Sequence, residues 1–483
     1  MGSEWVQTTL GQLTQKGGGF IQTGPFGSQL HASDYVEEGI PVIMPVNLVD
    51  NRISLENIAR ITEADAQRLS KHLVQEGDIV YSRRGDVTRK ALITSDEVGM
   101  FCGTGCLLVR PGDQVDPQFL KYHLSTPENQ EWIVRHAIGA TMPNLNTSIL
   151  GDVPLRIPSM VIQKLIAAIL GTLDNKITLN RQINTTLESM AQTLFKSWFV
   201  DFDPVIDNAL AAGNDIPEPL QARAERRKTL TPSPSPSRGR GEQAGIDAPL
   251  SPLPLEGEGL GEGKLPLKIQ QFFPDSFVFT EEMGWMPEGW ESSCVGYEFD
   301  VTMGQSPPGN TYNEEGAGLP FFQGRADFGF RYPSNRVFCS EPKRLASKGD
   351  TLVSVRAPVG DVNMASEEYC IGRGVAAVRH LSGSCSYTYY SMAQLREHFK
   401  VYEGEGTVFG SINQKDFKAL PVLTVPEQLV SRFDRISGEL DRKIELNTQS
   451  INLLSNLRDS LLPKLLSGQL SIPEAEQALD QVI

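Results

Sequence analysis

Leu173-Asp174-Asn175-Lys176-Ile177-Thr178-Leu179-Asn180 and Leu440-Asp441-Arg442-Lys443-Ile444-Glu445-Leu446-Asn447 are two copies of one segment, 267 residues apart (440 − 173). The offset holds along both flanks without a gap. Apolar residues recur there at steps of four, three and four, which is the spacing of a narrow coiled-coil seam. The sequence therefore predicts the same long amphipathic helix twice. The residues predicted to form the interface of this helix pair are Ile162, Ile166, Ile169, Leu173, Ile177, Leu187, Leu429, Phe433, Ile436, Leu440, Ile444 and Leu454.

Length and composition limit the class of protein. The 483 residues are too many for one core, so two or three domains are expected. A hydrophobic content of 40% and a charged content of 21% are ordinary for a soluble protein. No apolar run is long enough to span a membrane, and the first residues lack the pattern of a signal peptide. The net charge of −15 counts mildly against a nucleic-acid binder, although phosphate contact requires only a local basic face.

The cysteines and the histidines give no sign of a metal site. The six cysteines are scattered, with no CxxC pair and few histidines nearby, so they are predicted to be ordinary thiols in a reducing cytosol. No phosphate-binding loop is present either, because Glu258 and Leu265 stand where that motif requires Gly and Ser or Thr. We expect a cytoplasmic protein without a cofactor of its own.

The chain alternates between globular and helical stretches. A Pro/Ser/Gly-rich insert at 229–268 offers little apolar surface, so it is expected to be mobile and to have no role beyond spacing. The predicted segments are two globular stretches at 1–157 and 289–424, two helical regions at 158–200 and 425–467, a connector at 201–288 and a C-terminal tail at 468–483.

The globular stretches also repeat each other. Gly77-Asp78-Ile79-Val80-Tyr81-Ser82-Arg83-Arg84 corresponds to Gly349-Asp350-Thr351-Leu352-Val353-Ser354-Val355-Arg356, and each reads as a strand entered from a turn. Each stretch ends in a similar loop, at 139–146 and at 406–413. The Asn and Thr residues of these loops could contact DNA backbone or a partner, or could serve helix entry and turn chemistry.

These segments together resemble the specificity (S) subunit of type I restriction-modification enzymes, over nearly the whole chain outside the insert. The segments that carry the resemblance are GDIVYSRRG and GDTLVSVRAPVG, LDNKITLN and LDRKIELN, LFKSWFVDF at the end of the first helix and RDSLLPKLLSG at the end of the second. Each is weak alone, and their order makes the assignment specific.

The resemblance implies a non-catalytic subunit. In this family two target-recognition domains read the halves of a bipartite, asymmetric site in double-stranded DNA, and the helices set the distance between the halves. The implied partners are two adenine-methyltransferase (M) subunits and, through them, two translocase-nuclease (R) subunits. S-adenosylmethionine, ATP and Mg would be bound on those partners, and no cofactor on this chain. The implied fold is α+β: two α/β recognition domains separated by two long antiparallel coiled-coil helices, with a pseudo-two-fold internal repeat.

An antiparallel pairing of the helices makes a testable prediction. If the two repeated segments lie face to face, a two-fold contact is reciprocal. Asp174 would then approach Lys443, and Lys176 would approach Asp441. The alternative is four separately solvated charges, and exposed pairs contribute only about 0–1 kcal/mol.

Candidate DNA contacts are the arginine-rich turns, because reading bases in a groove requires planar donors on a fixed scaffold. Arg84 and Arg356 match between the copies, so they are expected to hold phosphate or structure rather than to read a base. The alternative is that all these residues are solvated arginines around an ordinary core. The candidates are Arg83, Arg84, Arg89, Lys90, Arg325, Arg331, Arg336 and Arg356.

Other readings of the sequence stay open. Trp198, Phe199 and Phe202 could form a docking patch or be buried against the neighbouring domain. A methyltransferase would need an Asn/Asp-Pro-Pro-aromatic motif, and the chain's Pro307-Pro308 lies in a different context. A coiled-coil adaptor that does not bind DNA, or a degenerate orphan specificity subunit, remains an alternative to the DNA-reading subunit. The target sequence and the spacer length cannot be read from the chain.

Overall fold

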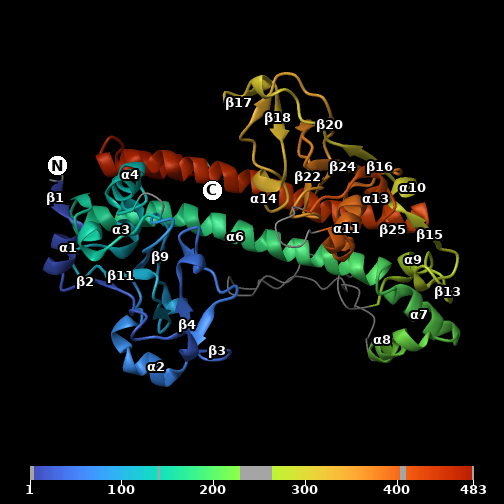
Figure 1. Ribbon diagram of the computed structural model, residues 1–483, viewed down its shortest axis with the longest axis horizontal. Helices are drawn as coiled ribbons and strands as arrows, with labels where there is room; N and C mark the ends of the chain where they lie inside the picture. Colours follow the sequence, from blue (N-terminus) through green and yellow to red (C-terminus); the bar gives the residue numbers. More distant parts are fainter. Residues whose placement is uncertain (1–4, 140–141, 229–263, 403–409, 481–483) are drawn as a thin grey trace, which may run out of the picture. The chain divides into compact units, whose positions relative to one another are not determined.

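The computed structural model describes residues 5–139, 142–228, 264–402 and 410–480, and it forms two compact units. Unit 1 contains residues 1–180 and 449–483, and unit 2 contains residues 181–448. Each unit therefore combines one globular stretch with one part of each long helix. The fold is the predicted mixture of α/β domains and paired long helices (Figure 1).

The globular domain of unit 1 is built on two four-stranded sheets. One has the order β2-β11-β8-β9 with antiparallel neighbours, and the other has the order β10-β4-β7-β3 with β10 and β4 parallel. Their bounds are β2 Phe20–Thr23, β11 Cys106–Arg110, β8 Ile79–Ser82, β9 Lys90–Leu92, β10 Phe101–Cys102, β4 Ile40–Ile43, β7 Ala59–Ile61 and β3 Tyr35–Val36. The short pairs are β1 Val6–Thr9 with β12 Pro154–Ile157, and β5 Leu48–Val49 with β6 Arg52–Ile53. The helices are α1 Leu10–Lys16, α2 Glu63–Arg68, α3 Pro117–His123, α4 Pro127–His136 and α5 Thr147–Gly151.

The globular domain of unit 2 follows the same plan. Its four-stranded sheet β16-β24-β21-β22 corresponds to β2-β11-β8-β9, and a five-stranded sheet β17-β19-β18-β23-β20 replaces the second sheet. The bounds are β16 Phe299–Met303, β24 Val375–His380, β21 Thr351–Ser354, β22 Val362–Met364, β17 Tyr312–Asn313, β19 Phe338–Cys339, β18 Leu319–Phe322, β23 Tyr369–Ile371 and β20 Leu345–Ala346. Strand β15 Glu291–Cys294 pairs with β25 Pro421–Thr424, and β13 Phe277–Thr280 with β14 Gly284–Pro287. The helices are α10 Val295–Glu298, α11 Cys385–Gln394, α12 Arg396–Phe399 and α13 Gln414–Lys418.

The long helices are α6 (Met160–Phe199) and α14 (Glu427–Ser467), and they run antiparallel (Figure 1). In unit 1 the first half of α6 shares a core with the second half of α14. In unit 2 the second half of α6 shares a core with the first half of α14. The predicted interface residues that are buried in these two cores are Ile166, Ile169, Leu173, Ile177 and Leu454 in unit 1, and Leu187, Leu429, Phe433, Ile436, Leu440 and Ile444 in unit 2. Ile162 is partly buried against the core of unit 1.

Buried polar residues mark the middle of both helices. In unit 1 the Asn180 amide donates to Ser450 Oγ over 3.1 Å. In unit 2 the Asn447 amide donates to Asn184 Oδ1 over 2.9 Å, and the Asn184 amide donates to Thr448 Oγ1 over 3.3 Å. A polar pair inside an apolar seam fixes the register, because sliding by one turn would leave buried amides without partners.

The predicted contacts of the two repeated segments are wrong. Asp174 binds Arg458, which lies 15 residues beyond Lys443 (458 − 443), or about 22 Å along a continuous helix. Asp441 binds Arg331, which also contacts Glu188, 12 residues beyond Lys176 (188 − 176). The prediction assumed that the two-fold centre lies at the repeated segments. Asn180 and Asn447, the last residues of the two segments, instead bind Ser450 and Asn184, which lie beyond the repeated segment of the other helix.

The connector contains ordered helices before and after the insert: α7 (Asp203–Ala212), α8 (Glu218–Lys228) and α9 (Leu267–Gln270). The predicted insert at 229–268 falls outside the described residues up to residue 263. Helix α8 is held to α7 by ion pairs, including a bidentate pair from Arg227 to Asp207 with distances of 2.8 and 2.6 Å. The chain after the insert returns to α7 as well, where the Asn208 amide donates to the carbonyls of Gln270 and Phe273.

The predicted C-terminal tail contains helix α15 (Ile472–Asp480), which corresponds to α7. Pro204 and Pro473 are the second residues of these helices, and Leu210 and Leu479 are the eighth. Ala475 is buried in the core of unit 1. The internal repeat therefore extends beyond the long helices into the segment that follows each of them.

Candidate DNA-contact surfaces

The Gly-Asp pair before each central strand has a structural role. Asp78 and Asp350 each accept a hydrogen bond from a backbone N–H three residues earlier, over 2.8 and 2.7 Å. Each also binds an arginine of the neighbouring strand: Arg110 Nε lies 2.8 Å from Asp78, and Arg379 Nε lies 2.7 Å from Asp350. The repeated motif therefore locks the turn that leads into strands β8 and β21, and it fixes where these strands begin.

The turn after each strand presents an exposed arginine at the same place in both units. Arg84 and Arg356 are exposed at the surface, and their backbones form isolated bridges to Asn144 and Ser411 respectively. The loops that were predicted at 139–146 and 406–413 thus support the arginine turns, although 140–141 and 406–409 lie outside the described residues.

The asparagines of these two loops serve helix entry. Asn146 Oδ1 accepts from the N–H of Ile149 over 2.8 Å, and Asn413 Oδ1 accepts from the N–H of Asp416 over 3.0 Å. These are N-cap hydrogen bonds, which satisfy the free N–H groups at the start of a short helix. Of the two interpretations of these asparagines, helix capping is the one for which hydrogen bonds are present.

The other exposed candidates have partners inside their own units. The Arg83 guanidinium lies 5.9 Å from the ring centroid of Phe26, and Arg89 Nε lies 3.3 Å from Asp86. Arg336 Nε lies 2.9 Å from Asp327 Oδ1. Arg325 contacts Asp361. The three arginines of these ion pairs are exposed, and in the Arg89–Asp86 pair the carboxylate is exposed as well, so a DNA phosphate could replace it at small cost.

Lys90 and Arg331 cannot contact DNA in this structure, because both are 1% exposed. Lys90 Nζ lies 5.7 Å from the ring centroid of Tyr81 and has no hydrogen-bond partner among the residues that the structure describes. Burial, with a smaller contribution from Lys121, lowers the Lys90 pKa to about 7. Arg331 lies against the rings of Tyr389 and Tyr390 and binds Asp441. The spacing of arginines and aromatics in the sequence does not distinguish a buried cation from an exposed one.

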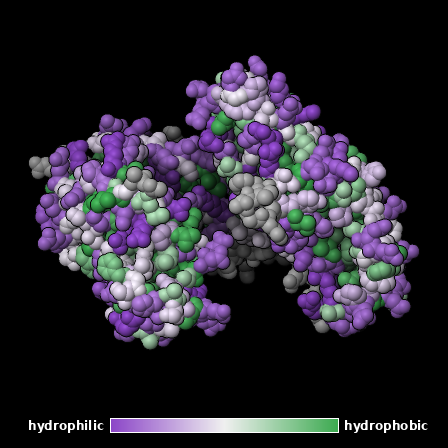
Figure 2. Space-filling view, in the orientation of Figure 1, coloured by the Kyte–Doolittle hydropathy of each residue, from purple (hydrophilic) through white to green (hydrophobic). Residues whose placement is uncertain are grey.

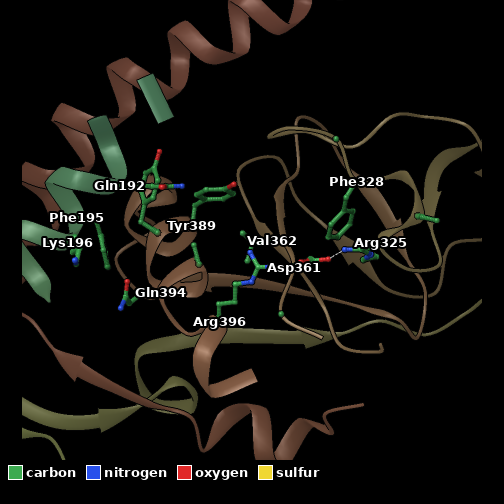
Figure 3. A pocket seen from close by; sticks show the side chains of 15 residues that line it. Gln192, Phe195, Lys196, Arg325, Phe328, Asp361, Val362, Tyr389, Gln394 and Arg396 are labelled. Carbon is green, nitrogen blue, oxygen red and sulfur yellow. Dashed lines mark hydrogen bonds and ion pairs between the residues drawn. The ribbon is translucent and has the colours of Figure 1, made fainter. Parts of the chain in front are cut away.

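A polar hollow of about 660 Å³ opens in unit 2 beside the exposed Arg325 (Figure 3). Arg325 and Asp361 point toward one another on one side (Figure 3). Lys196 of α6 and Arg396 of α12 line it as well. Sequence reasoning missed both of these cations. Lys196 lies inside LFKSWFVDF, which was interpreted only as a helix end, and Arg396 has no counterpart in the motifs.

The aromatic end of the first helix is buried rather than exposed. Trp198 packs edge-on against Phe273 at 5.2 Å, and Phe199 packs against Tyr387 at 5.2 Å. The ring centroids of Phe202 and Trp290 lie 5.8 Å apart. Of the two interpretations of this segment, burial against the neighbouring domain is therefore correct.

The surface shows few other candidates for chemistry. In the space-filling view the visible face of each unit is mostly hydrophilic, with hydrophobic residues in small separate groups (Figure 2). Among the described residues, no group of three or more His, Cys, Asp or Glu side chains could hold a metal ion. No helix in the described part of the chain is long and apolar enough to cross a membrane. All six cysteines are free thiols.

Comparison with known proteins gives a consistent family. Residues 3–189 match the model of the type I restriction modification DNA specificity domain. The type I restriction enzyme HindI specificity subunit of Haemophilus influenzae is 25% identical over 452 residues, which cover 88% of this chain and 93% of that protein. The MjaIX specificity subunit of Methanocaldococcus jannaschii is 22% identical over 459 residues, with 91% and 89% covered.

A solved structure supports the fold. The S subunit of a type I restriction-modification system from M. genitalium has a TM-score of 0.51 with 16% identity, and 96% of each chain is covered. At this identity the likeness concerns the architecture alone. The domain match at 3–189 and the full-length relatives, together with the repeated globular domains and the antiparallel helices, support the assignment of this chain as a specificity subunit of type I restriction-modification enzymes.

Proposed function

We propose that the chain reads a bipartite site in double-stranded DNA, one half with each recognition domain. The observation that carries this proposal is the internal repeat. Each unit contains the same sheet and the same exposed arginine turn, and each rests on one part of an antiparallel helix pair. Two similar reading modules in one chain suit two half-sites, as a two-fold protein suits a palindrome. Because the modules differ in their loops, the half-sites would differ in sequence.

Within each module the exposed cations would divide into two roles. Arg84 and Arg356 occupy equivalent turns, so they would contact phosphates, which are the same in every half-site. Arg325, Arg336, Arg396 and Lys196 of unit 2 have no equivalent arginine or lysine in unit 1 that the sequence repeat identifies, so they are the candidates for sequence-dependent contacts. Arg83 and Arg89 are the corresponding candidates in unit 1.

The partners would be two methyltransferase subunits and, through them, two translocase-nuclease subunits. Leu179 and Leu446 are equivalent residues of the repeated segments and are 41% and 54% exposed, whereas the other exposed leucines of the two helices, Leu165 and Leu453, are not equivalent to each other. An exposed apolar residue at the same place in both copies suits a partner that binds twice. The catalytic groups, S-adenosylmethionine, ATP and Mg would belong to those partners, and the complex would act in the cytoplasm.

Mapping of methylated adenines tests the proposal. The chain is expressed with its cognate methyltransferase subunit, and the DNA is sequenced by a method that detects modified adenine. Two short specific blocks around a fixed unspecified gap are expected, with one modified adenine in each block. A single uninterrupted motif would contradict two reading modules. No methylation by a complex that assembles would instead favour the coiled-coil adaptor.

A further inference from the structure

The repeated segment of each long helix begins with Gly-x-Leu-Asp, at Gly171–Asp174 and Gly438–Asp441, and both copies contact the same helix of their recognition domain. These helices are α3 in unit 1 and α11 in unit 2. A Cβ atom on Gly171 would lie 2.4 Å from Gln118 Nε2 of α3, and one on Gly438 would lie 3.9 Å from Ser386 Oγ of α11. Gln118 and Ser386 are the second residues of α3 and α11. A side chain at position 171 would therefore displace the end of the Gln118 side chain, whereas at position 438 a Cβ would make only an ordinary contact.

Three residues after its glycine, Asp174 is bound from two sides in unit 1. Its Oδ2 accepts hydrogen bonds from Tyr122 Oη over 2.7 Å and from Lys121 Nζ over 2.9 Å, both on α3. Its Oδ1 accepts from Arg458 of α14 over 2.8 Å. Burial raises the pKa of the Asp174 carboxyl. The cations Lys121 and Arg458 lower this pKa by more, so that it lies below its ordinary value. Domain, first helix and second helix meet at this one carboxylate.

Asp441 has the equivalent position in unit 2. Tyr390, the sixth residue of α11 as Tyr122 is of α3, places its Oη 3.3 Å from Asp441 Oδ1. Ser386 Oγ donates to Asp441 Oδ2 over 2.6 Å. The cation is Arg331, whose Nη1 lies 2.9 Å from Asp441 and which also contacts Glu188 of α6. Again one carboxylate joins domain, first helix and second helix.

The two contacts use the same tyrosine position but different cations. In unit 1 the cation Arg458 comes from the partner long helix, and in unit 2 Arg331 comes from the recognition domain. The feature that both copies share is therefore the Gly-x-Leu-Asp segment and the tyrosine. Apolar side chains along a helix allow a domain to slip by a turn, because a similar surface recurs every three to four residues. A charged hydrogen-bond acceptor recurs less often: on α6 no acidic residue lies one turn from Asp174, and on α14 the acidic residue one turn from Asp441 is Glu445, which pairs with Lys348 instead.

We propose that Gly171–Asp174 and Gly438–Asp441 are seats that fix where each recognition domain sits along the long helices, and that they thereby set the number of base pairs between the two half-sites. Asp174 and Asp441 are positioning residues in this proposal, since they act through the domains and touch no DNA. The inference rests on the proposed bipartite reading. It adds the residues that select one spacer length and reject its neighbours.

The test measures methylation of duplexes that carry the mapped half-sites with the native spacer, and with spacers one and two base pairs shorter or longer. The complex of the full chain with its methyltransferase is compared with the same complex carrying Asp174→Asn or Asp441→Asn. We expect each variant to lower the rate on the native spacer about tenfold. We also expect it to reduce the ratio of native to neighbouring spacers at least threefold. Glu439→Gln, an exposed residue between the seat residues Gly438 and Asp441, is the matched control and should keep the wild-type ratio.

The ratio separates positioning from stability. Loss of folded protein lowers the rate on all spacers by one factor and leaves the ratio unchanged, so an unchanged ratio overturns the inference. Tyr122→Phe and Tyr390→Phe remove one hydrogen bond and keep every charge, and they supply the same readout if the Asp variants do not fold. Failure of the proposed function would look different, because the wild-type complex itself would then show no preferred spacer.

Discussion

At the scale of single residues, burial divides the basic side chains into those that can meet DNA and those that hold the fold. Arg84 and Arg356 are exposed at equivalent turns, and their backbones are bridged to supporting loops. Replacing either with Ala should weaken DNA binding by a similar factor for every sequence. It should also reduce the slope of log affinity against log salt by about 0.9, which corresponds to one phosphate contact. Fluorescence anisotropy at several salt concentrations measures both quantities, and a change of sequence preference would contradict the phosphate role.

Lys90 is the opposite case, because burial of this cation lowers the free energy of unfolding. In the folded chain its pKa is about 7, against an ordinary value of 10.5. Below pH 7 the folded state must bury the charged ammonium, and the cost declines as the pH rises toward 10.5, where the unfolded chain is neutral too. Lys90→Met should therefore raise the free energy of unfolding by about 1–3 kcal/mol near pH 6.5 and by little near pH 10.

Thermal unfolding of the Lys90→Met variant at pH 6.5 and at pH 9.5 measures this difference. Lys71→Met, at an exposed residue, is the control and should change the unfolding temperature little at either pH. DNA affinity should stay at the wild-type value in both variants. A loss of affinity in Lys90→Met would mean that the side chain reaches the DNA after all.

At the scale of elements, the sequence repeat predicted the two long helices and their buried residues, but not the register in which the helices pair. The seam residues follow from apolar spacing alone, because a four-three-four pattern allows only one buried face. The register does not follow, since an apolar seam fits itself at several offsets. It is fixed by the buried amides of Asn180, Asn184 and Asn447, which the sequence does not distinguish from exposed ones. Likewise the predicted partners of Asp174 and Asp441 were wrong, because each aspartate binds a helix of its neighbouring globular domain and a different arginine, Arg458 or Arg331.

The sequence predicted a connector at 201–288 but not the ordered helices within it. Both ends that flank residues 229–263 are held on α7, by the Arg227–Asp207 pair on one side and by the Asn208 amide on the other. Replacement of residues 229–263 by a short Gly/Ser linker should therefore leave the unfolding temperature and the methylated motif unchanged. The comparison is made by calorimetry and by methylation mapping. A lowered unfolding temperature would show that the replaced residues contribute to the fold.

The ion pair that holds α8 makes a separate prediction. Arg227→Ala leaves Asp207, which is buried, without its bidentate partner. Removing one member of a buried pair costs about 3–5 kcal/mol. Denaturant unfolding should show this loss, while Lys228→Ala, at the exposed neighbouring residue, should cost less than about 0.5 kcal/mol. A loss in Arg227→Ala no larger than in the control would mean that α8 does not depend on the pair.

At the scale of the whole molecule, two modules of one plan share a pair of helices, and the modules differ where DNA sequence would be read. The common features are the sheet order, the locked turn before the central strand, the exposed arginine after it, and the tyrosine that binds the seat. If specificity is confined to each module, exchange of one module should change one half of the target. It should leave the other half and the spacer as they were, provided that the tyrosine of the seat is kept.

A chimaera tests this independence directly. Residues 289–424 are replaced by the corresponding region of the Haemophilus influenzae relative, with the residue at the position of Tyr390 retained as Tyr. Methylation mapping should then give a motif with one new block and one unchanged block, at the original spacing. A motif in which both blocks change would mean that the modules read DNA jointly. A changed spacing would mean that other parts of the exchanged domain select the spacer length, because the contact between Asp441 and Tyr390 is kept in the chimaera.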